Sequence, residues 1–202
     1  LKNSLAPLVL IGGGCAGCED DLYSFFNMCN IPAICSLRGL DCINNSYHAF
    51  MGMVGEYGSY TAKVAAYNCD LLIVLGSRLD DRQIGYDISE FCPHAKIVQI
   101  DIDNNEIGRK VKDGILIHSD VKDFLQYFSK HCSPSAFTFN NWVKALNDCK
   151  KKKDYLIPTD MCYIANRTIQ HILELSPKES IYTIDVGQNQ MISAQILSKR
   201  TS

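Results

Sequence analysis

The sequence predicts an α/β protein built on a doubly wound, parallel sheet. Short apolar runs alternate with segments whose apolar residues recur at helical spacing, a glycine-rich turn follows the first run, and charged residues crowd the end of a central run. Strands separated by helices form parallel crossovers that cover both faces of a sheet with helices. The predicted fold class is therefore α/β and Rossmann-like.

Five apolar runs are the predicted strands. They carry few polar residues and show no clear alternation, which is typical of strands that are buried on both faces of a parallel sheet. The runs are Pro7–Ile11, Ile31–Cys35, Leu71–Leu75, Lys96–Ile100 and Ile115–His118.

Helices are expected between these strands. Glu19–Met28 has apolar residues at helical spacing, Ser59–Tyr67 is rich in alanine, and Val121–Phe128 follows an aspartate that caps it. The glycine-rich segment Met51–Gly55 has the composition of a loop.

The chain divides into three predicted parts. Residues 1–132 form a nucleotide-binding-like domain, 133–157 a linker and 158–202 the start of a second unit. The linker carries an expected helix at Trp142–Cys149 and four consecutive lysines, while the second unit has an expected helix at Met161–Leu175 and an expected strand at Ile181–Ile184. Because the chain begins without Met and ends soon after that strand, we expect a piece of a longer protein.

Composition excludes several classes of protein. The 202 residues are 47% hydrophobic and 21% charged, with a net charge of -2. This balance provides no electrostatic footprint for nucleic acid or an anionic membrane, and no apolar run approaches the roughly 20 residues of a membrane span. Ten cysteines lie scattered through the chain, several within apolar segments, which indicates buried free thiols in a reducing, cytoplasmic setting.

The segment Gly12–Gly17 matches G-x-G-x-x-G between a strand and a helix. One interpretation is that its glycines admit a phosphate to backbone N–H groups, and the other is that they only permit close helix–sheet packing. A dinucleotide fold also expects an acid at the end of the second strand. Here Ser36, Leu37 and Arg38 stand there instead, and Arg38 would suit a 2′-phosphate.

Cys15 and Cys18 form a C-x-x-C pair, which a thiol-redox protein would use with lowered thiol pKa values. The scattered further cysteines favour the alternative, inert thiols. No second cysteine pair or spaced histidine pair completes a zinc site, so no metal ligands and no catalytic residues are predicted within the chain.

Charged residues follow the predicted strand Leu71–Leu75. Ligands of open α/β sheets bind beyond the carboxyl ends of strands, and four charges in five positions, Arg78 to Arg82, are costly beside a core unless they pair or meet a ligand. Asp101 and Asp103 end the next strand, where they suit ribose or ribityl hydroxyls or cap the following turn.

The segment Gly76–Gly85 resembles the G-x-R-x-D-D-R-x-x-G signature of the acetolactate synthase family of thiamine-diphosphate (ThDP) enzymes. Further phrases follow in the order found in that family. They are Leu8–Gly14, Ile31–Gly39, Met51–Gly55, Asp70–Gly85, Lys96–Gly108 and Ile184–Gln195. The resemblance implies a central domain of the family followed by the start of its ThDP-binding domain.

The resemblance also implies the cofactor-binding residues. For FAD, held in an extended pose by the central domain, they are Gly13, Ser36, Leu37, Met51, Gly52, Met53, Gly55, Gly76, Ser77, Arg78, Leu79, Asp80, Asp101, Ile102, Asp120 and Val121. For thiamine diphosphate they are Val186, Gly187, Gln188, Asn189 and Met191.

The family's activity implies a transferase that decarboxylates pyruvate on thiamine diphosphate and adds the two-carbon unit to a second 2-oxo acid, in branched-chain amino acid biosynthesis. Thiamine diphosphate and magnesium would be held mostly by residues outside this chain, as would the activating Glu, so the fragment alone is expected to be inactive. Its partners would be the rest of its own polypeptide and the other subunits of a homodimer or homotetramer. The alternatives are a nucleotide-binding domain of another ThDP enzyme, from a sugar or capsule pathway, and a thiol-redox protein.

Six positions depart from the family pattern. Asn189 stands in place of His, Ile192 of Trp, Ser193 of Ala, Arg38 of Met or another neutral residue, and Gln83-Ile84 of Val-Thr. These changes bear on which 2-oxo acid or aldehyde is used and on whether FAD is bound.

Overall fold

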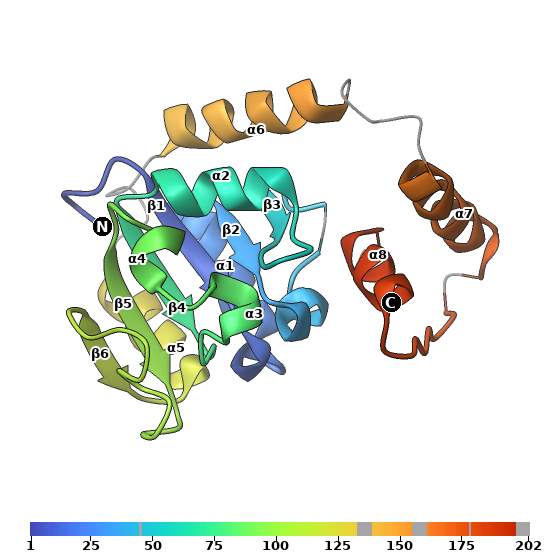
Figure 1. Ribbon diagram of the computed structural model, residues 1–202. Helices are drawn as coiled ribbons and strands as arrows, with labels where there is room; N and C mark the ends of the chain where they lie inside the picture. Colours follow the sequence, from blue (N-terminus) through green and yellow to red (C-terminus); the bar gives the residue numbers. More distant parts are fainter. Residues whose placement is uncertain (45, 133–138, 155–160, 178, 197–202) are drawn as a thin grey trace.

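The computed structural model describes residues 1–44, 46–132, 139–154, 161–177 and 179–196. Six parallel strands form one sheet in the order β3-β2-β1-β4-β5-β6 (Figure 1). The strands are β1 (Pro7–Ile11), β2 (Ala33–Cys35), β3 (Phe50–Met53), β4 (Leu71–Leu75), β5 (Lys96–Asp101) and β6 (Ile115–His118). This is the strand order of dinucleotide-binding sheets, and it confirms the predicted fold class.

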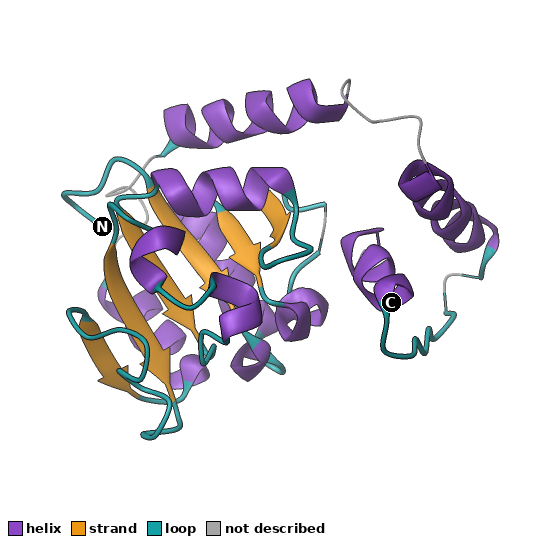
Figure 2. Cartoon of the chain, in the orientation of Figure 1, coloured by secondary structure: helices purple, strands orange, loops and turns teal. Residues whose placement is uncertain are grey.

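Helices cover both faces of the sheet (Figure 2). The first part of the chain contains the 3-10 helices η1 (Gly13–Cys15) and η2 (Leu37–Cys42) and the helices α1 (Glu19–Cys29), α2 (Tyr60–Asn68), α3 (Asp81–Ile84), α4 (Ile88–Phe91) and α5 (Val121–His131). The later helices are α6 (Asn140–Asp154), α7 (Met161–Leu175) and α8 (Gln188–Ile196). None of the helices in the described parts of the chain is both long and apolar enough to cross a membrane.

Alternate residues of β1 divide the core into two layers. Val9 and Ile11 pack with α1 and α5, whereas Leu8 and Leu10 pack with α2 and α6. All four side chains are fully buried, so the central strand has no polar face. This explains why its sequence is a continuous apolar run rather than an alternating one.

Two helices begin with a side-chain cap, and the cap by Asp120 was predicted from the sequence. The Ser59 hydroxyl accepts a hydrogen bond from the backbone N–H of Ala62 (3.2 Å) at the start of α2. A carboxylate oxygen of Asp120 accepts one from Lys122 N–H (2.7 Å) at the start of α5. Each cap satisfies an N–H group that has no partner within its helix.

Helix α6 lies within the segment predicted as a linker and packs on the outside of α2 (Figure 1). Its Val143 and Leu146 side chains are buried in the same core layer as Leu8 and Leu10. The Trp142 indole N–H donates to the carbonyl of Pro7 (3.1 Å), which ties the helix to the start of β1. Helix α6 is therefore an outer layer of the sheet domain.

The expected loop at Met51–Gly55 is wrong in part, because Phe50–Met53 is strand β3. This strand is at the edge of the sheet, pairs with β2 and shifts register between Ala33 and Cys35. Gly52 has φ 101° in this strand, and a Cβ there would lie 2.5 Å from the Ser59 hydroxyl oxygen. A short edge strand with an irregular glycine therefore carries the composition of a loop.

The expected strand at Ile181–Ile184 is also wrong, since these residues form no regular element. A strand needs a neighbour to receive its backbone hydrogen bonds, and no strand among the described residues pairs with this segment. The Ile181 side chain is 91% exposed.

The turns after β1 and β4 touch through their backbones. Gly12 N–H donates to the Leu75 carbonyl (2.8 Å), and Gly14 N–H donates to the Gly76 carbonyl (3.0 Å). A Cβ at Gly12 would lie 2.1 Å from the Gly76 oxygen, and one at Gly14 would lie 2.8 Å from its Cα. Gly12 and Gly14 therefore serve close packing, one of the two interpretations of the G-x-G-x-x-G segment.

We expect Gly12→Ala to destabilise the fold by about 2–4 kcal/mol, because its methyl group must displace the backbone of the β4 turn. The matched control is Gly17→Ala, where the added Cβ meets no atom within 4 Å but the φ of 80° is unfavourable. That control should lose only about 1–2 kcal/mol. Urea unfolding checks both values, and equal losses would contradict the packing role of Gly12.

Candidate functional site

The carboxyl ends of the six parallel strands lie along one edge of the sheet. The turns there carry Ser36 after β2, Gly13 after β1, Gly76 after β4, Asp101 at the end of β5 and Asp120 after β6. All residues assigned to FAD by resemblance thus lie at or next to this edge. Since the strands are side by side, the turns form a row suited to an elongated ligand.

Some residues of this row have buried side chains, and others have side chains exposed to solvent. The side chains of Met51, Met53, Ser77, Leu79 and Val121 are at most 5% exposed, so these residues would meet a ligand through their backbones. Two apolar side chains of the row reach solvent. They are Leu37, 37% exposed, and Ile102, 66% exposed.

Leu79 fixes the turn after β4. It has φ 55°, in the left-handed region that non-glycine residues seldom adopt, while its side chain is fully buried. The Leu79 N–H donates to the Ser77 hydroxyl oxygen (3.4 Å), and that hydroxyl donates to Gln83 Oε1 (3.2 Å). Burial of Leu79 therefore stabilises a strained turn in which Arg78 and Asp80 point outward.

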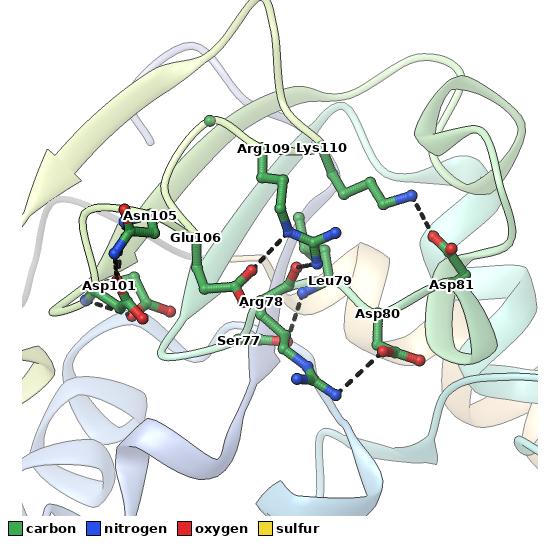
Figure 3. A network of polar contacts seen from close by, with 12 residues as sticks. Ser77, Arg78, Leu79, Asp80, Asp81, Asp101, Asn105, Glu106, Arg109 and Lys110 are labelled. Carbon is green, nitrogen blue, oxygen red and sulfur yellow. Dashed lines mark hydrogen bonds and ion pairs between the residues drawn. The ribbon is translucent and has the colours of Figure 1, made fainter.

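The charged residues of this turn pair at the surface (Figure 3). Arg78 Nη2 lies 3.2 Å from Asp80 Oδ2, and the two side chains are 64% and 42% exposed. Asp81 pairs with Lys110. The prediction that these charges pair or meet a ligand is correct about the pairing of Arg78, Asp80 and Asp81. They do not stand beside the core, however, because Arg78, Asp81 and Arg82 are exposed.

Gln99 is a supporting residue that the sequence analysis missed. Its side chain is fully buried in β5. The amide nitrogen donates to the carbonyls of Ser77 and Glu106 (3.4 Å each), and Oε1 accepts from Gly108 N–H (3.1 Å). A lone polar residue inside an apolar strand could have pointed to this role, because a buried amide needs hydrogen-bond partners.

The loop between β5 and β6 is hydrogen-bonded to the turn after β4 (Figure 3). Arg109 Nη2 donates to the Arg78 carbonyl (3.3 Å), and its Nε donates to Glu106 Oε2 (2.7 Å). This hydrogen bond to the Glu106 carboxylate raises the pKa of Arg109 above its ordinary value. The β5–β6 loop and the turn after β4 are thus joined by side-chain hydrogen bonds.

Asp101 and Asp103 have the capping role that the sequence allowed. Asp101 Oδ1 accepts from Asp103 N–H (2.9 Å), and Asp103 Oδ1 accepts from Asn105 N–H (2.9 Å). Within the described chain, no donor reaches Oδ2 of Asp101. That oxygen can accept a hydrogen bond from a ligand hydroxyl.

A groove of about 860 Å³ borders the β3 end of the edge. Gly55 and Arg82 lie where it meets the edge, and the Glu56 N–H donates to the Arg82 carbonyl (3.1 Å) there. Farther along, apolar and aromatic side chains from α2 to α4 line it, among them Val64, Tyr67, Ile84, Tyr86 and Phe91. Its volume falls in the usual range for small-molecule sites.

Cys15 and Cys18 do not have the environment of reactive thiols. Burial, followed by neighbouring Cys42, raises the pKa of Cys15, whose Sγ donates to the Leu75 carbonyl (3.4 Å). Burial also raises the pKa of Cys18, and Asp120 adds to the effect. A redox pair needs a lowered thiol pKa, so the structure favours the inert interpretation of C-x-x-C.

The residues assigned to thiamine diphosphate lie at the other unit. Gly187, with φ 153°, precedes α8, and Gln188 begins it. Val186 is 85% exposed, and the first turn of α8 contains no acidic residue. Helix α8 packs on α7 and also contacts β3. Among the described residues, no group of three or more His, Cys, Asp or Glu side chains could hold a metal ion.

The sheet order and the row of turns define the class: an α/β domain that presents a nucleotide-type edge. Residues 1–128 match the family described as "Thiamine pyrophosphate enzyme, central domain". The chain therefore belongs to the thiamine pyrophosphate enzymes.

Individual relatives extend the match into the second unit. The chain is 34% identical over 198 residues to an acetolactate synthase large subunit of Lactococcus lactis, covering 96% of this chain and 34% of the relative. It is 32% identical over 210 residues to a probable acetolactate synthase large subunit of Methanocaldococcus jannaschii, covering 99% and 35%. It is 34% identical over 198 residues to "Acetolactate synthase 1, chloroplastic" of Zea mays, covering 96% and 31%. The chain thus spans about a third of the length of these relatives.

Asp80 caps α3 by accepting from Arg82 N–H (3.1 Å), as Asp87 caps α4 by accepting from Ser89 N–H (2.8 Å). We expect Asp80→Ala to lose about 1 kcal/mol of unfolding free energy, chiefly from the cap, because its exposed ion pair contributes little. Asp80→Asn keeps a capping oxygen and should lose less. Asp87→Ala is the matched control for capping alone. A loss in Asp80→Asn equal to that in Asp80→Ala would show that charge, and not capping, is the larger effect.

The buried thiols should make the fold sensitive to alkali. Burial raises the pKa of Cys92 from its ordinary value of 9.0 to about 11, and that of Cys69 to about 12. The unfolded chain ionises first, so the stability held below pH 9 is lost as the pH rises from about 9 to about 11 or 12. At pH 10 the loss is about 1 kcal/mol for each thiol.

Urea unfolding of wild type and Cys92→Ala at pH 7 and pH 10, in reductant, isolates this contribution. The variant should lose less stability than wild type between the two pH values. An equal loss in both proteins would show that the Cys92 thiol does not contribute.

Proposed function

We propose that this chain is part of an acetolactate synthase-like transferase. It would hold FAD along the carboxyl edge of the sheet and contact thiamine diphosphate at the start of α8. The observation that carries the proposal is similarity to acetolactate synthase large subunits over 96% or more of the chain in two relatives, through both units. The intact protein would join a two-carbon unit from pyruvate to a second 2-oxo acid.

The residues at the edge fit FAD. At the centre of the row the backbones of Gly12, Gly14 and Gly76 pack together, and none of these residues has a side chain that would obstruct a ligand. Exposed Ile102 offers an apolar contact, and Asp101 Oδ2 offers an acceptor for a hydroxyl. The groove beside Gly55 provides apolar walls at the opposite end. The FAD would be structural, since the condensation involves no net redox change.

The start of α8 fits the diphosphate group of thiamine diphosphate. A helix N-terminus presents unpaired N–H groups, and no acidic residue in the first turn opposes an anion. Thiamine diphosphate, when bound, supplies the electron sink for decarboxylation. This chain would bind and orient it through Gly187, Gln188 and Asn189, while magnesium and the activating Glu would be held by residues outside the chain.

The protein would work as a homodimer or homotetramer in the cytoplasm. Nine described cysteines are free thiols, which suits a reducing compartment. Asn189 and Ile192, where the family pattern has His and Trp, favour a second candidate: a ThDP enzyme that uses a different 2-oxo acid or aldehyde.

The test is purification of the intact protein, followed by flavin absorbance and acetolactate formation from pyruvate with thiamine diphosphate and magnesium. We expect bound flavin and acetolactate. A panel of 2-oxo acids and aldehydes distinguishes the second candidate, which would give another product. Retention of flavin without product from any of these substrates would overturn the transferase.

A variant addresses the coenzyme contact. Gly187→Ala places a Cβ 2.9 Å from Asn189 Oδ1 in an unfavourable backbone region, so it should weaken thiamine diphosphate binding about tenfold or more. FAD binding should be unchanged, and Gly17→Ala should alter neither affinity. The isolated 202-residue chain should form no acetolactate, and turnover by it would contradict the assignment of catalytic groups outside the chain.

A further inference from the structure

Arg38 is held in place by the turn that follows β2. The Ser36 N–H donates to the Ile11 carbonyl (2.9 Å), and the Ser36 hydroxyl accepts from Gly39 N–H (3.1 Å). A Cβ at Gly39 would lie 2.3 Å from the Ile11 oxygen, so η2 packs directly on the end of β1. The base of the Arg38 side chain is therefore fixed relative to the glycine turn.

The Arg38 side chain lies over Gly13. A Cβ built on Gly13 would be 3.1 Å from Arg38 Cβ and 3.5 Å from Arg38 Nε. Arg38 is solvent-exposed. In the described parts of the chain no carboxylate forms an ion pair with it. An uncompensated guanidinium thus stands at the turn where a nucleotide would cross from β2 to β1.

The usual source of positive potential is missing at this turn. In dinucleotide-binding folds the pyrophosphate lies at the N-terminus of the first helix. Here the glycine turn forms the 3-10 helix η1, which ends at Cys15 before α1 begins at Glu19, and the first turn of α1 carries Glu19, Asp20 and Asp21. Three carboxylates oppose an anion at that helix end. A phosphate at Gly13 therefore needs a cation from elsewhere.

We propose that Arg38 is a specificity-determining residue that binds the phosphate groups of the dinucleotide as they pass over Gly13. A guanidinium forms paired, charge-assisted hydrogen bonds to phosphoryl oxygens, which a neutral residue at this position does not. The inference rests on the proposed nucleotide edge. Its ligand chemistry is a phosphoryl anion, either the pyrophosphate of FAD or a 2′-phosphate on an adenosine ribose.

The experiment measures dissociation constants of the intact apoprotein for FAD, riboflavin, ADP and 2′,5′-ADP, by flavin fluorescence and calorimetry. Arg38→Met should weaken FAD and ADP about 10- to 100-fold, the loss expected for a charge-assisted hydrogen bond. Riboflavin, which has no phosphate, should be unaffected. Arg38→Lys should recover part of the affinity, and Lys130→Met, which removes a cation from α5, should change nothing. Rising salt should weaken FAD binding less in Arg38→Met than in wild type.

The outcomes separate this inference from the proposed function. If wild type binds FAD and Arg38→Met binds it equally well, the role of Arg38 is overturned and the FAD edge stands. If wild type binds ADP through Arg38 but no flavin, the inference holds and the FAD proposal fails. If wild type binds none of the four ligands, both are overturned. A selective loss of 2′,5′-ADP, with FAD and ADP unchanged, would assign Arg38 to the ribose phosphate and reject the pyrophosphate.

Discussion

The backbone contact between the turns after β1 and β4 is the constraint on which the candidate site depends. These strands are neighbours at the centre of the sheet, where the strand order reverses. In sheets of this order a ligand enters the crevice between such turns. Here hydrogen bonds from Gly12 and Gly14 close the crevice. The proposed ligand would therefore lie across the edge, as an extended nucleotide does, rather than enter between the strands.

Rigidity of the edge comes from contacts between turns that are far apart in the sequence. Gln99 donates a hydrogen bond to the carbonyl of Ser77, and Arg109 donates one to the carbonyl of Arg78. Lys110 pairs with Asp81. The surface ion pair contributes little stability by itself. Together with buried Leu79, however, these contacts fix a strained turn in one conformation. The site is thus preorganised by packing and buried polar groups more than by its visible charges.

Sequence patterns predicted the elements whose burial is uniform. The runs that became β1 and β4 are apolar throughout, because each strand has a neighbour on both sides and helices on both faces. The strand β3 was mistaken for a loop because an edge strand tolerates an irregular glycine. Ile181–Ile184 has the composition of a strand but no pairing partner among the described residues, and pairing is a long-range property that composition does not contain. The contacts of Gln99 could not be predicted either, because they also join residues that are far apart in the sequence.

The electrostatics of the edge invert the usual arrangement. A typical dinucleotide fold attracts phosphate with a helix end and places an acid after its second strand. In this chain the helix end carries three acids, and the cation follows the second strand. Each change alone would harm phosphate binding or leave a stray charge. Together they place the acids at the start of α1 and the cation of Arg38 beside Gly13. In the proposed phosphate site, Gly12 and Gly14 would pack the turn against β4, while Gly13 would leave room for the phosphate and Arg38 would supply the charge.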